Sequence, residues 1–140
     1  MSCNVIELAK YIVSKCSNDH CPISNLQLQK ILYYIQVKWL TKTGAPLFTN
    51  DICAWQFGPV VPEVYYLYNG YGASKILSQY DVDIPSDVKE VIDPIIDEKR
   101  DKKPWDLVED THRKDGPWDT IYRNGQGERQ VIPIDLLKKV

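Results

Sequence analysis

Cysteine and histidine are the first residues whose types could support chemistry here. Cys16, His20 and Cys21 lie within six residues, and Cys3 is a fourth candidate ligand. Zinc sites use such residues, but commonly as paired Cys-x2-4-Cys and His-x3-5-His elements. The spacing here is irregular, and the adjacent His20 and Cys21 cannot easily face one ion. We therefore expect no metal and no cofactor, with Cys16 and Cys53 in the core.

His112 is a candidate general base, because it follows Asp110 and carboxylates often orient catalytic imidazoles. A small hydrolase using His112 would need Cys53 or an acidic residue to be brought beside it by the fold. The chain contains no Gly-x-Ser-x-Gly elbow, phosphate-binding loop or dinucleotide fingerprint. We favour a structural histidine, hydrogen-bonded near a helix end, and expect no enzyme activity. The hydrolase remains an alternative.

Tyrosine is concentrated in two short stretches: Tyr33 and Tyr34, and then Tyr65, Tyr66, Tyr68 and Tyr71. Neighbouring residues of a helix point about 100° apart, so one narrow buried stripe cannot hold both Tyr65 and Tyr66. Exposed tyrosine is enriched at protein interfaces because the ring offers a large area with a polar tip. A binding face and a broad core face with solvated hydroxyls both remain open.

Helix signals are strongest in the first third of the chain. Asn4 is a good N-cap for a helix that reaches about residues 15–17. The stretch Ser24-Asn25-Leu26-Gln27 is a capping box, and apolar residues then recur at helical spacing as far as Trp39. Gly44 stands where a glycine would end this second helix.

Prolines mark several later elements. Pro62, Pro104 and Pro117 suit the first position of helices. Pro94 interrupts an apolar helical pattern, so that helix either kinks or starts afresh with Asp93 as its cap. Short extended segments are expected at residues 52–57 and 131–132, and a short helix at residues 134–137. The predicted fold is mainly α: a compact single-domain bundle, residues 1–140, of five to seven short helices with a small β element.

Composition and charge exclude several classes of protein. The net charge is −2 with acids and bases interspersed, so we expect no direct nucleic-acid binding. No stretch approaches the roughly 20 apolar residues of a membrane helix, and the first residues lack the basic start of a signal peptide. Four cysteines suit free thiols in a reducing compartment. The expected location is the cytoplasm.

The stretch Ala54 to Tyr65, AWQFGPVVPEVY, is too rigid for a linker and too apolar for an ordinary surface loop. Gly58 permits an unusual backbone angle or a close approach, Pro59 fixes a turn, and Pro62 starts a helix. We interpret these three residues as architectural. Trp55 and Tyr65 are then carried on either side of a rigid corner.

Three motifs, in order, resemble one known family. They are SNLQLQKILYY at residues 24–34, PLF at 46–48 with AWQFGPVVPEVY at 54–65, and Leu107, Thr111-His112 and Pro117-Trp118 near the carboxyl end. Together they resemble the Panacea domain, the SocA-like antitoxin family that includes phage-associated GepA-like proteins. The resemblance covers about residues 5–137. The stretch Lys103 to Asp106 and the interrupting Pro94 depart from the family pattern, so this region could be specific to one partner.

This resemblance implies a mainly helical antitoxin that binds a cognate protein toxin. It also implies two routes of neutralisation, namely direct blocking and delivery of the toxin to a ClpXP-type protease. A phage or prophage protein that targets a host factor is the alternative. The motif residues expected near the partner-binding face, or bracing it, are Lys30, Tyr33, Trp55, Tyr65 and Tyr68. Those expected to be structural are Gly58, Pro59, Pro62, Thr111, His112 and Trp118.

Overall fold

The computed structural model describes residues 2–140, which form seven helices and three short strands. The helices are α1 (Val5–Asn18), α2 (Asn25–Thr43), α3 (Pro62–Tyr68), α4 (Ser86–Lys99), α5 (Pro104–Thr111), α6 (Pro117–Tyr122) and α7 (Ile134–Leu137). The strands are β1 (Cys53–Trp55), β2 (Gly58–Val60) and β3 (Gln130–Val131). Single 3₁₀ turns follow α3 at Asn69–Tyr71 and α6 at Arg123–Gly125. The predicted mainly helical bundle with a small β element is confirmed.

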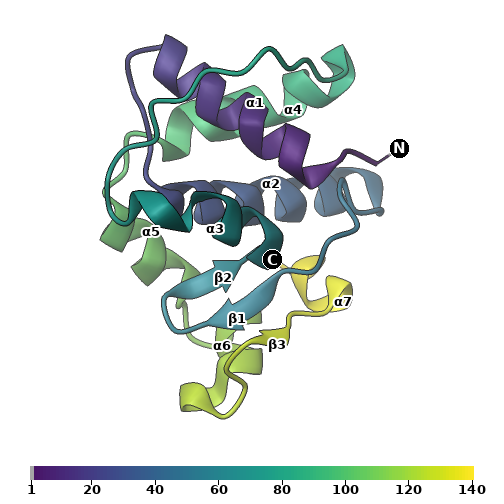
Figure 1. Cartoon of the computed structure of the whole chain (residues 1–140). Helices are drawn as coiled ribbons and strands as arrows, with labels where there is room; N and C mark the ends of the chain where they lie inside the picture. The colour runs from purple at the N-terminus through teal and green to yellow at the C-terminus, as the bar shows by residue number, and fades with distance from the viewer. Residues whose placement is uncertain (1) are drawn as a thin grey trace.

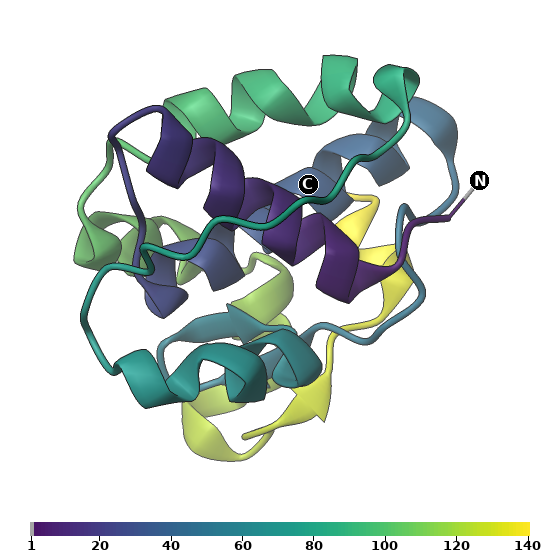
Figure 2. The same cartoon turned by 45° about the horizontal axis from the view of Figure 1, so that its top comes forward.

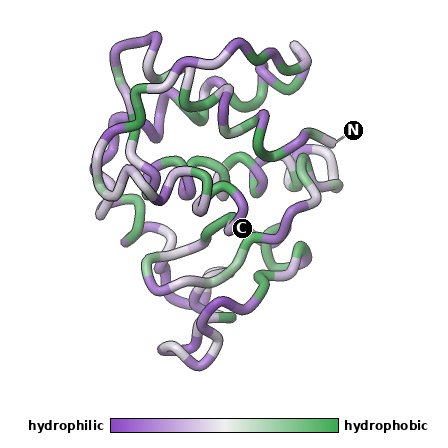
Figure 3. The backbone as a smooth tube through the Cα atoms, viewed as in Figure 1, coloured by the Kyte–Doolittle hydropathy of each residue, from purple (hydrophilic) through white to green (hydrophobic). Residues whose placement is uncertain are grey.

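Helix α2 is the central element, and it contacts α1, α3, α4, α5, α7 and β2 (Figure 1). Its ends form as the sequence predicts. The Ser24 hydroxyl and the Gln27 side chain make the reciprocal bonds of a capping box, and Gly44 ends the helix with a φ of 81°. Hydrophobic and hydrophilic residues alternate along α2 in the middle of the molecule (Figure 3), and the helix buries side chains of both kinds. A helix surrounded by other elements is buried on most of its faces.

Three buried glutamines of α2 fasten neighbouring segments to it. The Gln36 amide donates to the Phe48 carbonyl at 2.9 Å and accepts from the Leu47 amide at 2.9 Å. The Gln27 amide donates to the Lys102 carbonyl at 3.0 Å. The Gln29 side-chain oxygen accepts from the backbone amide of Val61, the residue before α3, at 2.9 Å. Buried polar side chains therefore connect α2 to segments with few backbone partners of their own.

The three strands form an antiparallel sheet in the order β2-β1-β3, with Cys53 opposite Val60 and Val131. Strand β3 forms the lower edge of this sheet in Figure 1, and helix α6 lies near it, at the end of the molecule away from α1 and α4. Residues 73–85 cross α1 as an extended segment (Figure 2), where the Ser14 hydroxyl accepts from the Tyr80 amide at 2.7 Å.

Pro94 lies inside α4, which runs without interruption from Ser86 to Lys99. The alternative in which a new helix starts at Asp93 is therefore wrong. The Asp93 carboxylate does not cap the backbone but accepts a hydrogen bond from the Tyr11 hydroxyl at 2.7 Å. Packing of Val88, Ile92 and Ile96 into the core outweighs the one backbone hydrogen bond that the proline removes.

Candidate functional site

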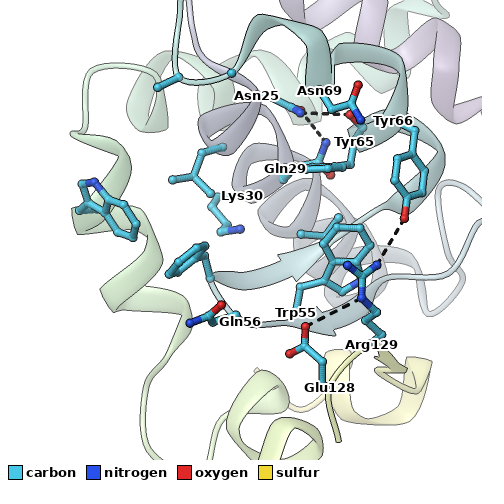
Figure 4. A pocket seen from close by; sticks show the side chains of 16 residues that line it. Asn25, Gln29, Lys30, Trp55, Gln56, Tyr65, Tyr66, Asn69, Glu128 and Arg129 are labelled. Carbon is cyan, nitrogen blue, oxygen red and sulfur yellow. Dashed lines mark hydrogen bonds and ion pairs between the residues drawn. The ribbon is translucent and has the colours of Figure 1, made fainter. Parts of the chain in front are cut away.

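A cavity of about 520 Å³ opens beside the turn between β1 and β2 (Figure 4). Its lining comes from α2, the β1–β2 hairpin, α3, the start of α5 and the loop before β3. The lining includes the side chains of Gln29, Lys30, Trp55, Phe57, Tyr65, Tyr66, Trp105, Glu128 and Arg129. The site is therefore assembled from segments far apart in the sequence.

Lys30 forms part of the cavity's inner wall, and its side chain is fully buried. Its ammonium donates to the Pro59 carbonyl at 3.1 Å, and no carboxylate of residues 2–140 forms an ion pair with it. Removal from water disfavours the charged form, so burial lowers the pKa of Lys30 to about 7. An unneutralised buried cation is a costly feature.

Gly58 allows the hairpin to lie directly against this lysine. Its φ is +112°, a conformation that side chains disfavour. A Cβ at this position would stand 2.8 Å from Lys30 Cε and 2.8 Å from Thr111 Oγ1. Thr111 is itself buried and donates to the Val108 carbonyl at 2.8 Å. The glycine is therefore required both by its backbone angle and by the close approach.

A buried amide bridge forms the wall beside Lys30. Gln29 donates to the Asn25 side chain at 2.9 Å and accepts from the Val61 backbone amide at 2.9 Å. Asn25 in turn donates to the Tyr65 carbonyl at 3.1 Å. This bridge fixes α3 against α2, and with it the two tyrosines of α3 that line the cavity.

We predict that Gln29→Ala lowers the free energy of unfolding by about 2 kcal/mol, because it leaves the buried Val61 amide and the side-chain oxygen of Asn25 without a partner. Gln56→Ala is the matched control, since Gln56 lines the same cavity but is exposed. Denaturant titrations of both variants measure the difference. Equal stability of the two variants would show that the bridge contributes little.

Aromatic side chains surround the mouth of the cavity. Trp55 packs edge-on against Tyr65, with ring centroids 4.9 Å apart. Phe57 and Trp105 meet at 5.2 Å, although they come from the hairpin and from α5. Phe57 is 46%, Tyr66 55% and Trp105 59% exposed, so large apolar rings face solvent around one opening. We call Trp55, Phe57, Tyr65, Tyr66 and Trp105 the aromatic rim.

Arg129 completes this opening beside the rim. Its guanidinium lies 4.1 Å from the centre of the Trp55 ring, in a cation–π contact. It also donates to the Tyr66 hydroxyl at 3.3 Å, as drawn in Figure 4. The arginine is exposed, so its remaining N–H groups can serve a ligand at the mouth.

The structure brings together three of the five residues predicted for partner binding. Trp55 and Tyr65 are half-buried in the rim, and Lys30 lies inside the cavity. Tyr33 and Tyr68 are buried outside the cavity lining, and the Tyr68 hydroxyl donates to Tyr80 at 3.1 Å. Lys30, Tyr33 and Tyr68 are buried in this structure. Whether each of the five residues contacts a partner or braces the face stays a prediction.

The remaining motif residues converge behind the hairpin. The Trp118 indole donates to the Trp55 carbonyl at 2.7 Å, which ties α6 to β1. His112 stacks on Trp118 with ring centroids 3.6 Å apart. Pro59 accepts from Lys30, and Pro62 occupies the first turn of α3. The motifs thus meet around one corner, although they are separated in the sequence.

His112 is held by packing rather than by hydrogen bonds. Its Nε2 is buried with no hydrogen-bond partner among the residues that the structure describes. Burial, and then the nearby Lys30, lower the pKa of its imidazole, while burial raises the pKa of the Cys53 thiol. A histidine–cysteine pair in catalysis needs the opposite trend for the thiol.

The described cysteines are free: Cys16 and Cys53 are buried, as predicted, and Cys3 and Cys21 are half-buried. Within residues 2–140, no group of three or more His, Cys, Asp or Glu side chains is arranged to hold a metal ion. Over the same residues, no helix has the length and apolar character needed to cross a membrane.

Several residues around the mouth are not among the site residues that the sequence predicts. Phe57 lies inside the AWQFGPVVPEVY motif but is not singled out by it, Trp105 and Arg129 lie outside the quoted motifs, and Tyr66 enters only as one of a tyrosine cluster. Trp105 lies in the stretch that departs from the family pattern, and this departure is the sequence feature that could have pointed to it. No sequence feature points to Arg129, because its position over Trp55 depends on the pairing of β3 with β1.

Comparisons with known proteins agree with the resemblance seen in the motifs. The family model described as "Antitoxin SocA-like, Panacea domain" matches residues 28–119. The chain is 32% identical over 149 aligned residues to the antitoxin SocA of Caulobacter vibrioides, covering 95% of this chain and 77% of that protein. No solved structure matches the chain.

Proposed function

Because the chain belongs to the SocA-like Panacea family of antitoxins, we propose that it neutralises a cognate protein toxin by direct contact through the aromatic rim. Family membership supports an antitoxin of a toxin–antitoxin system and suggests a role without catalysis. The observation that carries the proposal for the rim is the cluster of exposed rings with an arginine around one cavity.

The composition of the rim is that of an interface centre. Tryptophan, tyrosine and arginine dominate the binding energy of protein interfaces, particularly where they surround a pocket that excludes water. Here Phe57, Tyr66 and Trp105 expose about half of their surface while their backbones are held by the hairpin, α3 and α5. Side chains already ordered before binding lose little conformational entropy on association.

Direct neutralisation is the route that this surface favours, and delivery of the toxin to a ClpXP-type protease is the alternative route. Either route begins with binding of the toxin. Measuring the toxin's half-life in cells with and without the protease separates them, since delivery shortens the half-life only when the protease is present. We place the protein in the cytoplasm, where its four free thiols would stay reduced.

Co-expression with the toxin encoded by the adjacent gene tests the proposal. The wild-type chain should restore growth, and the double variant Phe57→Ser/Trp105→Ser should lose the rescue, because affinity falls by about 100-fold or more when two interface aromatics are removed. Leu77→Ser is the matched control: Leu77 is 68% exposed and lies outside the cavity lining. Rescue by the double variant would exclude the rim, and failure of the wild type would exclude the antitoxin role.

A further inference from the structure

We infer that the cavity takes an acidic segment of the toxin, whose carboxylate pairs with Arg129 while a neighbouring apolar side chain enters the cavity beside Lys30. This inference rests on the proposed function and names the chemistry of the partner. It is carried by the position of Arg129, the balance of charge in the lining and the size of the cavity.

Arg129 is held in place before any partner binds. Its guanidinium stacks on Trp55 and donates to Tyr66, and its backbone amide donates to the Ala54 carbonyl at 2.6 Å. Its φ is +68°, which costs a non-glycine residue about 1–2 kcal/mol. Strained residues of this kind persist where the surroundings hold them, and they cluster at ligand-binding sites. These contacts hold the Arg129 guanidinium at the mouth of the cavity.

The intramolecular counterion of Arg129 is weak. Glu128 Oε1 lies 4.0 Å from Arg129 Nε, at the outer limit of an ion pair, and both side chains are largely exposed. Arginine presents five N–H donors in a planar fork that matches a carboxylate, and the contacts to Tyr66 and Glu128 leave part of that fork unused. A carboxylate from a partner can occupy the remaining donors.

The lining of the cavity has a positive balance in a chain of net charge −2. Arg129 is its permanent cation and Glu128 is the one acid among its lining residues, while Lys30, whose pKa burial lowers to about 7, carries its charge in only part of the molecules at neutral pH. Apolar walls exclude water, which strengthens the attraction of Arg129, and of Lys30 when it is protonated, for an incoming anion. An acidic partner segment is therefore the occupant that complements this surface, and a basic segment is disfavoured.

The cavity also requires an apolar group beside the acid. A volume of about 520 Å³ is well above what one carboxylate fills, and it lies in the range of pockets that enclose large side chains or small ligands. The exposed rings of Phe57, Tyr66 and Trp105 continue the apolar surface beyond the mouth. This extended contact area favours a protein segment over a free small molecule.

Calorimetric titration with the purified product of the adjacent toxin gene tests the inference. We expect Arg129→Gln to weaken binding by about 10- to 100-fold and to reduce its dependence on salt, since one charge pair is lost. Arg123→Gln is the matched control, because Arg123 is also exposed, also has a positive φ and lies outside the lining. That control should bind like the wild type.

A second measurement uses the wild-type chain alone, so that it does not depend on folding of a variant. Peptides that tile the toxin sequence are compared with copies in which each Asp and Glu is replaced by Asn or Gln. One acidic peptide should bind and its neutral copy should not. Toxin binding that is unchanged by Arg129→Gln, or neutral copies that bind equally well, would overturn the inference while the antitoxin role stands. Failure of the toxin to bind the wild type would overturn both.

Discussion

Gly58→Ala is expected to lower the free energy of unfolding by about 2–5 kcal/mol and the Tm by about 10 °C. Two causes add. A φ of +112° strains any residue with a Cβ, at about 1–2 kcal/mol, and the added methyl would stand 2.8 Å from both Lys30 Cε and Thr111 Oγ1. Neither neighbour can retreat without cost, since Thr111 and Lys30 are both buried and hydrogen-bonded.

Two other glycines separate these causes. Gly44 has a φ of +81° and no neighbouring atom within 4 Å of where a Cβ would stand, so Gly44→Ala should show backbone strain alone, about 1 kcal/mol. Gly70 has neither a positive φ nor a close neighbour, and Gly70→Ala should be near neutral. Thermal unfolding and denaturant titration measure the series. A Gly58→Ala loss no larger than that of Gly44→Ala would mean that the close approach contributes nothing.

Local chemistry makes much of the fold predictable. The capping box at Ser24, the glycine at the end of α2 and the prolines at the starts of α3, α5 and α6 act within a few residues of where they stand. Pro94 is ambiguous in the sequence because a proline's effect depends on packing. The burial of Ile92 and Ile96 on either side of it keeps α4 continuous, and no local pattern reports that burial.

The site is predictable only where a motif residue has an unusual physical requirement. Gly58 can be identified because a glycine among valines, prolines and aromatic residues is conspicuous in the sequence. Trp55 can be identified because it lies in the same stretch, AWQFGPVVPEVY. Lys30 is predicted near the partner face from its place in the SNLQLQKILYY motif, yet it is fully buried against Pro59. Arg129 and Trp105 reach the cavity through long-range packing, which one sequence does not encode in any local pattern.

The convergence of the motifs explains why they belong together. Lys30 from the first motif bonds the Pro59 carbonyl of the second, and Thr111 and Trp118 from the third contact Gly58 and bond Trp55. We infer a division of labour in which these motif residues set the shape of the hairpin. Phe57, Trp105 and Arg129 are exposed at the mouth, where the proposed contact with a toxin would be made.

Lys30→Met is expected to change the pH dependence of stability more than any other single substitution. The pKa of Lys30 is about 7 in the folded chain and about 10.4 in an unfolded one. Between these values the unfolded state binds more protons, so the wild-type free energy of unfolding rises with pH. The contribution of one such group is about 1.4 kcal/mol per pH unit, or about 5 kcal/mol in total, and Lys30→Met removes it.

Other groups titrate over the same range with the opposite sign. Burial raises the pKa of the Cys3, Cys16, Cys21 and Cys53 thiols. The folded state therefore holds these protons longer than the unfolded state, which lowers stability as the pH rises above about 8.5. The cysteines contribute equally in the wild type and in Lys30→Met. Subtracting one curve from the other therefore leaves the contribution of Lys30 to the pH dependence of stability.

Urea titrations at intervals from about pH 6.5 to pH 10 supply these curves. Methionine leaves the Pro59 carbonyl without its donor, which lowers the free energy of unfolding by about 1–3 kcal/mol equally at every pH. The test is therefore how the difference in free energy of unfolding between the wild type and Lys30→Met changes with pH. Lys38→Met replaces an exposed lysine of the same helix and controls for the change from lysine to methionine. A Lys30→Met curve that runs parallel to the wild type would mean that Lys30 keeps an ordinary pKa and that water reaches its ammonium through the cavity wall.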